Sequence, residues 1–153
     1  MLLLAMAHSF TEPVSRMTTK SKTCPCHSNK EYIMCCGRFH SGHKPLNAVE
    51  LMRSRYSAYA LNLASYIIDT TDTSSPLYQK DKNLWVQQIN TFARNTEFIG
   101  LEIKSFVETS LTIAEVVSTA TFKQQGQDAS FTEKSFFTKT ADTWLYNHGI
   151  VSS

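Results

Sequence analysis

Four cysteines are the residues of this sequence whose type and spacing most clearly predict chemistry. They all fall within thirteen consecutive positions, and the chain has no other cysteine; they are Cys24, Cys26, Cys35 and Cys36. Thiolates are soft ligands that zinc prefers, and four of them complete its tetrahedral shell without leaving an open position. The spacing therefore predicts one structural zinc ion per chain, held by these four cysteines, and no reaction at the metal.

Two other interpretations of the cysteine cluster stay open at this level. The cysteines could form a redox dithiol, or one nearby histidine (His27, His40 or His43) could replace a cysteine as ligand. Clustered thiols in a reducing cell suit a metal better than disulfides, which predicts a cytoplasmic protein. The apolar run at residues 2–7 is too short to cross a bilayer, so no membrane partner is expected.

The charge of the chain is unevenly distributed. Up to Arg55 there are eight Lys and Arg against three Asp and Glu, whereas the rest of the chain is net acidic. A basic N-terminal part favours an anionic partner, such as RNA or an acidic protein face. Alternatively, Lys22, Lys30 and Arg38 simply offset the charge of about −2 that four thiolates leave around one zinc ion.

The periodicity predicts an α+β fold in three segments: a flexible tail at 1–22, a zinc knuckle at 23–44 and a larger domain at 45–150. Caps at Asn47 and Asp81 begin helices, with a short helix between them. From residue 97 the apolar period changes to two, which predicts four antiparallel strands. We expect about three helices packed on a curved antiparallel sheet, with a pocket between them.

The residues between the cysteines resemble the SEC-C motif, named for the C-terminal tail of the SecA translocation ATPase. The segment from Cys24 to Gly37 reads CPCHSNKEYIMCCG, where the usual pattern is C-P-C-G-S-G-K-x-Y-x-x-C-C/H-G. His27 and Asn29 replace two glycines, which would allow a positive φ. His and Asn are among the other residues that tolerate it best, so the resemblance still implies the knuckle.

Downstream segments are similar to those of YchJ-like bacterial proteins. The matching segments are the LMRSRYSAY helix at 51–59 and the strands at 98–101, 133–137 and 144–146. The resemblance implies a SEC-C knuckle followed by a cone-shaped domain of the nuclear-transport-factor-two-like (NTF2-like) superfamily. Many members also carry a second SEC-C motif, whereas this chain has no cysteine after Cys36. The family implies a fold and a metal but no reaction.

Four polar residues are candidates for a site in the larger domain. Arg53 and Arg55 lie on its first helix, and Glu133 and Ser135 share one face of a strand because residues i and i+2 point the same way. An arginine that meets Glu133 in the cone would form a structural pair or recognise an anion. Further acid–base candidates, without any catalytic spacing, are Asp69, Asp72 and His148. Whether the protein is an enzyme is left open.

Three functions are compatible with these observations. The first is a protein-interaction module: by resemblance to the SecA tail, the knuckle would dock a chaperone, a translocation component or a ribosomal component. Its expected contact residues are Lys22, Lys30, Arg38 and Lys44. The second is a small-molecule binding protein or enzyme that uses the cone. The third is weak nucleic-acid or ribosome binding through the basic N-terminal part.

Overall fold

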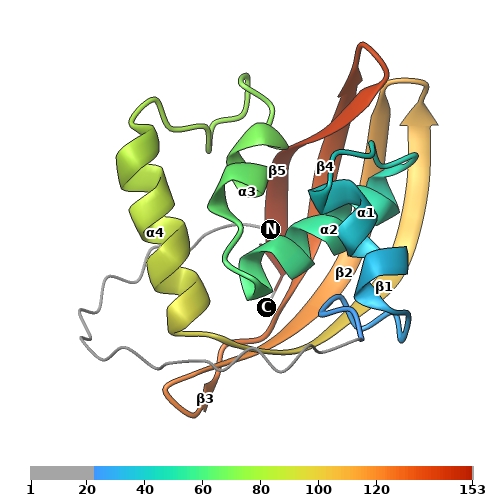
Figure 1. The fold of residues 1–153 in the computed structure, drawn as a ribbon. Coiled ribbons are helices and arrows are strands. Elements are labelled where there is room, and N and C mark those ends of the chain that lie inside the picture. The colour runs from blue at the N-terminus through green and yellow to red at the C-terminus, as the bar shows by residue number, and fades with distance from the viewer. Residues whose placement is uncertain (1–22, 153) are drawn as a thin grey trace.

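The computed structural model describes residues 23–152, in which one curved antiparallel sheet carries all the helices on one face (Figure 1). The cysteine segment comes first, with a 3-10 turn at Tyr32–Met34 and the short helix α1 at Cys36–His40. Three helices and the sheet follow. The predicted α+β fold, a small cysteine knuckle before three helices on a curved sheet, is confirmed.

The sheet has the order β1-β2-β4-β5, and the short strand β3 pairs with β2 beside this path. The strands are β1 at Glu97–Ser110, β2 at Ile113–Gln124, β3 at Gln127–Asp128, β4 at Phe131–Thr140 and β5 at Thr143–Ser152. Positive φ values at Gln125 and Gly126, and again at Ala141 and Asp142, form the tight turns before β3 and β5.

Two of the three helices of the larger domain begin at the caps that the sequence predicts. In α2, Ala48–Ala60, the Asn47 side chain accepts a hydrogen bond from the Glu50 amide at 2.9 Å. In α4, Lys82–Arg94, Asp81 accepts one from the Leu84 amide at 3.0 Å. Between them lies the short α3, Ala64–Asp69. Each cap satisfies a backbone N–H that has no partner inside its helix.

The core lies between the helices and the concave face of the sheet. Along β2, buried and half-buried residues alternate, as expected for a strand that is covered on one face. Helix α2 contacts β1, β2 and β5, and nine of its thirteen residues are buried. An aromatic cluster packs there, with the rings of Tyr56 and Phe122 stacked and that of Phe98 edge-on to both.

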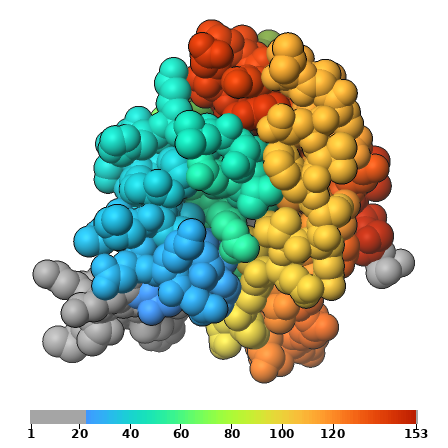
Figure 2. Space-filling view, turned by 90° about the vertical axis from the view of Figure 1, so that its right-hand side faces the viewer, coloured from blue at the N-terminus to red at the C-terminus, as the bar shows by residue number. Residues whose placement is uncertain are grey.

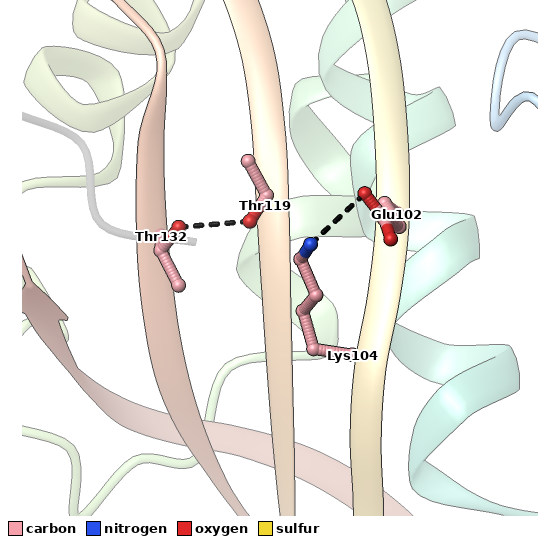
Figure 3. Close-up of polar contacts among 4 residues, drawn as sticks. All are labelled: Glu102, Lys104, Thr119 and Thr132. Carbon is pink, nitrogen blue, oxygen red and sulfur yellow. Dashed lines mark hydrogen bonds and ion pairs between the residues drawn. The ribbon is translucent and has the colours of Figure 1, made fainter.

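The opposite face of the sheet carries a row of polar side chains across three strands. Glu102, Thr119 and Thr132 lie side by side on β1, β2 and β4 and point away from the helices (Figure 3). The two threonine hydroxyls are 2.8 Å apart, and Lys104 Nζ lies 3.1 Å from Glu102 Oε2. These side chains face water, and no described helix covers them. We therefore expect an enclosed site on the other face, between the sheet and the helices.

The strands are longer than their apolar alternation predicts. β1 continues to Ser110 and β5 to Ser152, because their outer parts pair along the backbone while their side chains remain exposed. The predicted tail at 1–22, including Lys22, lies outside the described residues. The segment boundary between residues 44 and 45 stays a prediction. No helix within residues 23–152 has the length and apolar character needed to cross a membrane.

Candidate metal centre

The four cysteine sulfurs converge on one point. Their Sγ atoms all lie within 4.8 Å of one another, and all four side chains are buried. The Sγ atom of Cys35 is 3.6 Å from that of Cys26 and 4.0 Å from that of Cys36. A tetrahedral ion with metal–sulfur bonds of about 2.3 Å needs sulfurs about 3.8 Å apart. The cluster therefore fits a closed four-thiolate metal site.

The first cysteine pair is positioned by a tight loop. The Cys24 amide donates to the Lys30 carbonyl at 2.8 Å, which closes the loop around Cys26. Within it, His27 has φ 61° and Asn29 has φ 65°. These are the two positions where the SEC-C pattern has glycine, and the left-handed backbone explains that preference. The sequence-based expectation of a positive φ at both positions is confirmed.

The second cysteine pair lies at the junction of two short helical turns. The Cys35 amide donates to the Tyr32 carbonyl at 3.0 Å, and α1 begins at the next residue. Gly37 follows in close contact with the preceding turn, because a Cβ atom built there would lie 2.7 Å from the Tyr32 carbonyl oxygen. A side chain at this position would push the two turns apart and move Cys35 and Cys36 with them.

Replacing Gly37 with alanine is therefore expected to weaken metal binding. The added methyl group meets backbone rather than a flexible side chain, so the 3-10 turn has to shift. We expect the metal dissociation constant to rise at least tenfold, which corresponds to a loss of binding free energy on the order of 1.4 kcal/mol. Competition with a chromogenic chelator measures it. The exposed Lys44→Ala serves as control, and equal affinity in both variants would contradict the close-approach argument.

The thiols have unequal proton affinities when no cation neutralises them. A hydrogen bond from the neighbouring Cys26 thiol lowers the pKa of Cys24, with a smaller contribution from Cys36. The pKa of Cys36 is raised because this thiol donates to Cys24 and is buried. A divalent cation at the centre would favour the thiolate at all four positions and release their protons.

The knuckle packs directly on helix α2. Arg53 donates from Nη1 to the Cys26 carbonyl at 3.0 Å, and the Ser57 hydroxyl lies 3.5 Å from Cys24 Sγ. Figure 2 shows the knuckle, in blue to cyan, as a lobe that is exposed on the surface beside the larger domain. Arg53 therefore orients the metal loop and lies apart from the polar interior, where the sequence had suggested that it could contact Glu133.

His40 joins the knuckle to the larger domain. Its Nε2 lies 2.8 Å from the Ser54 carbonyl, and its Nδ1 lies 2.7 Å from the Tyr32 hydroxyl. A carbonyl only accepts, so Nε2 carries the proton and Nδ1 accepts from the tyrosine. The ring also packs edge-on against Tyr66. His40 thus has a bridging role, and among residues 23–152 the cluster of metal-binding groups consists of cysteines only.

Stability should depend on pH through His40. Burial lowers its pKa in the folded protein below the ordinary value of 6.5. The unfolded chain therefore binds the proton more readily, so His40 favours folding above pH 6.5, and this contribution is lost as pH falls from 6.5 toward the folded-state pKa. Melting temperatures between pH 5 and 8 should fall more steeply toward acid in the wild type than in His40→Gln, with metal content monitored as control. Parallel curves would contradict this assignment.

A second polar group lies under α2, on the side away from the knuckle. Arg55 and Glu133 are each 1% exposed. Tyr146 connects them, because its hydroxyl donates to Glu133 Oε1 at 2.9 Å while its ring lies 4.6 Å from the Arg55 guanidinium carbon. Ser135 donates to the same Glu133 oxygen at 2.8 Å. The structure thus brings together Arg55, Glu133 and Ser135 of the predicted group.

Helix α3 and the residue pair after it anchor Arg55. Its Nη1 donates to the Ile67 carbonyl at 3.0 Å and to the hydroxyls of Thr70 and Thr71 at 2.8 and 3.1 Å. Neither these threonines nor Tyr146 were singled out for the polar group in the sequence. A Thr-Thr pair at a helix end has no distinctive pattern, and Tyr146 resembles any other core aromatic of a strand.

The remaining acid–base candidates do not converge on this group. Asp72 accepts a hydrogen bond from Thr138 at 2.6 Å, which lowers the pKa of its carboxyl and holds it in a loop. His148 stacks on Phe136 and lies 2.8 Å from Asn147 Oδ1. Asp69 is exposed at the end of α3. None of the three side chains lies with Arg55, Glu133 and Ser135.

Comparison with known proteins supports the same two-part description. The family model described as "YchJ, middle NTF2-like domain" matches residues 47–149. A UPF0225 protein of Haemophilus influenzae (strain PittGG) is 36% identical over 136 residues, which cover 88% of this chain and 82% of that protein. A UPF0225 protein of Bordetella pertussis is 33% identical over 129 residues, covering 82% and 90%.

Solved structures extend the similarity to the knuckle. A SEC-C motif containing protein from Rhodopseudomonas palustris has a TM-score of 0.72 and 28% identity, and the match covers 86% of this chain and 99% of that one. A SEC-C motif containing protein from Psychrobacter arcticus has a TM-score of 0.69 and 27% identity, with 86% and 83% covered. The cysteine cluster, the helices on a curved sheet and these matches together show that the chain belongs to the YchJ-like family, in which an NTF2-like domain accompanies a SEC-C motif.

Proposed function

We propose that this protein is a zinc-binding interaction module whose knuckle docks an acidic, partly apolar segment of a partner protein. Zinc is the metal that a closed shell of four thiolates suits best, since it needs no open position and no redox change. The bound zinc then stabilises the fold of the knuckle, and the partner protein binds to the outer surface of the knuckle. Elemental analysis of reduced protein should find zinc near one per chain.

The exposure of two large apolar side chains carries this proposal. Ile33 is 71% exposed and Met34 is 64% exposed, and both lie on the 3-10 turn directly before Cys35. The backbone of this turn is fixed by the Cys35 and Gly37 contacts, so both side chains project from a defined backbone. Exposed apolar side chains on such a backbone are typical of interaction sites, because the backbone needs no ordering when they become buried.

The charges around this turn favour an acidic partner. Lys30 and Arg38 flank Ile33 and Met34 in the chain and are exposed, while Glu31 is the acidic residue of the same stretch. The thiolates are buried beneath the surface, so a docking segment would meet the basic side chains first. By resemblance to the SecA tail, an acidic chaperone or a ribosomal component has the matching chemistry.

A surface double variant tests the proposal. Ile33→Ser/Met34→Ser removes the apolar contacts and leaves the cysteines intact, whereas Leu111→Ser removes an 89% exposed leucine from the turn between β1 and β2. Binding to a purified acidic translocation chaperone and to ribosomes is measured by sedimentation and fluorescence anisotropy. We expect binding to one of them to fall about tenfold or more in the double variant only, as for loss of interface anchors.

Two results would reject this function. One is a double variant that binds as tightly as wild type, with zinc content equal in both. The other is that neither protein partner binds while single-stranded RNA does, with an affinity that falls steeply as salt rises, which would favour the nucleic-acid alternative.

A further inference from the structure

A small cavity lies beside the polar group of the larger domain. Its volume is about 50 Å³. It lies between α2, the segment that joins α3 to α4, the start of α4 and β5. Its walls are formed by Arg55, Tyr59, Thr71, Leu77, Gln79, Trp85 and Tyr146. One water needs about 10–15 Å³ of such space, so the cavity has room for roughly four non-hydrogen atoms.

Arg55 lines this cavity and carries an unsatisfied donor. Its Nε has no hydrogen-bond partner within the described part of the chain, although the side chain is 1% exposed. Its Nη1 is fully used by Ile67, Thr70 and Thr71, and its plane rests on Tyr146. The guanidinium is therefore held rigidly. Its Nε is itself buried, so Nη2 is the nitrogen left to donate to a ligand in the cavity, and a carboxylate oxygen is a matching acceptor.

The other walls select the class of ligand. No Asp or Glu is among the seven lining residues, so Arg55 is the one formal charge of the cavity wall. Burial raises the pKa of Tyr59 to about 12, so its hydroxyl keeps its proton near neutral pH and can donate to an anion. Leu77 and the aromatic ring of Trp85 supply apolar surface. A planar anion with a short apolar part fits these walls.

We propose that this cavity binds a small carboxylate of about four non-hydrogen atoms, with Arg55 Nη2 and the Tyr59 hydroxyl as donors and Leu77 and Trp85 around its alkyl end. The site is independent of knuckle docking, since Arg53 and Ser57 contact the knuckle from the other side of α2. A ligand of this size binds weakly, and a dissociation constant on the order of 1 mM is expected.

Nuclear magnetic resonance of the full, metal-loaded chain tests this proposal directly. The Arg55 Nε–H signal and the Trp85 indole N–H signal lie at the site, while Trp144, the second tryptophan, does not line the cavity and serves as internal reference. Titration with sodium acetate and sodium propionate should shift the Arg55 and Trp85 signals saturably. Acetamide, which has the same shape without the charge, should shift them about tenfold less at equal concentration.

Two variants separate binding from folding. Leu77→Trp fills the cavity and keeps Arg55, so it should lose the acetate response while its spectrum remains folded. Tyr59→Phe removes one donor and should weaken binding about threefold to tenfold. The proposal is overturned if acetate and propionate produce no saturable shift, if acetamide matches them, or if Leu77→Trp binds like wild type.

Discussion

Replacing Cys26 with serine is expected to abolish metal binding and to unfold the knuckle. The Sγ atom of Cys26 is completely buried and lies 3.6 Å from that of Cys35, so its loss opens the tetrahedral shell. Structural zinc contributes about 10–16 kcal/mol of apparent binding free energy to domains too small to fold alone. Elemental analysis should fall from near one zinc per chain to almost none, and thiol reagents should react quickly with the three remaining cysteines.

Ser57→Ala is the matched control for this variant. The Ser57 hydroxyl touches Cys24 Sγ from α2 but is no ligand, so its removal should leave the zinc content near one per chain. The amide spectrum should lose the signals of residues 23–44 in Cys26→Ser and keep them in Ser57→Ala. A Cys26→Ser protein that retains stoichiometric zinc and those signals would show that the four-thiolate assignment is wrong.

Replacing Arg55 with methionine is expected to give the largest loss of stability in the larger domain. The substitution keeps much of the side-chain volume but removes the positive charge opposite Tyr146 and Glu133, which are both buried. Breaking a buried charge group by removing one member typically costs about 3–5 kcal/mol. Urea unfolding, followed by tryptophan fluorescence, should therefore show a clearly lower midpoint with little change in slope.

Arg53→Met, two residues away on the same helix, controls for this result. Arg53 is half-buried and makes one hydrogen bond, to the Cys26 carbonyl, so about 1–2 kcal/mol is expected. The loss for Arg55→Met combined with Glu133→Gln should be smaller than the sum of the two single losses, because Tyr146 contacts both groups and couples them. Equal losses for the two arginine variants, or strictly additive losses for Arg55→Met and Glu133→Gln, would contradict the coupled group.

The knuckle could be predicted from sequence because its information is local. Ligand spacing, the loop between Cys24 and Lys30 and the need for positive φ at residues 27 and 29 all follow from a few neighbouring residues. The secondary structure of the larger domain was predictable for a similar reason. The caps at Asn47 and Asp81 and the change to a two-residue period after residue 97 are visible in the chain itself.

The interior polar group was only partly predictable, because it depends on three-dimensional packing. Arg53 and Arg55 are separated by about 200° around a helix, so they must point to different sides, but the sequence does not show which side faces the knuckle. The knuckle covers the side of α2 that faces away from the sheet. Both sides of the helix are therefore largely buried, and its sequence shows no clear apolar stripe. The role of Tyr146 follows from the approach of β5 to Arg55, which no local pattern encodes.

The left-handed residues of the knuckle have a consequence for the chain before it folds. Glycine at positions 27 and 29 would leave the unfolded segment many conformations, whereas His27 and Asn29 restrict them. Less conformational entropy is then lost when the loop closes around its ion, by about 0.4–1 kcal/mol at each position. Strain of about 1 kcal/mol per left-handed residue opposes this gain. The two effects nearly cancel, so a SEC-C motif can lose both glycines and remain pre-organised for its metal.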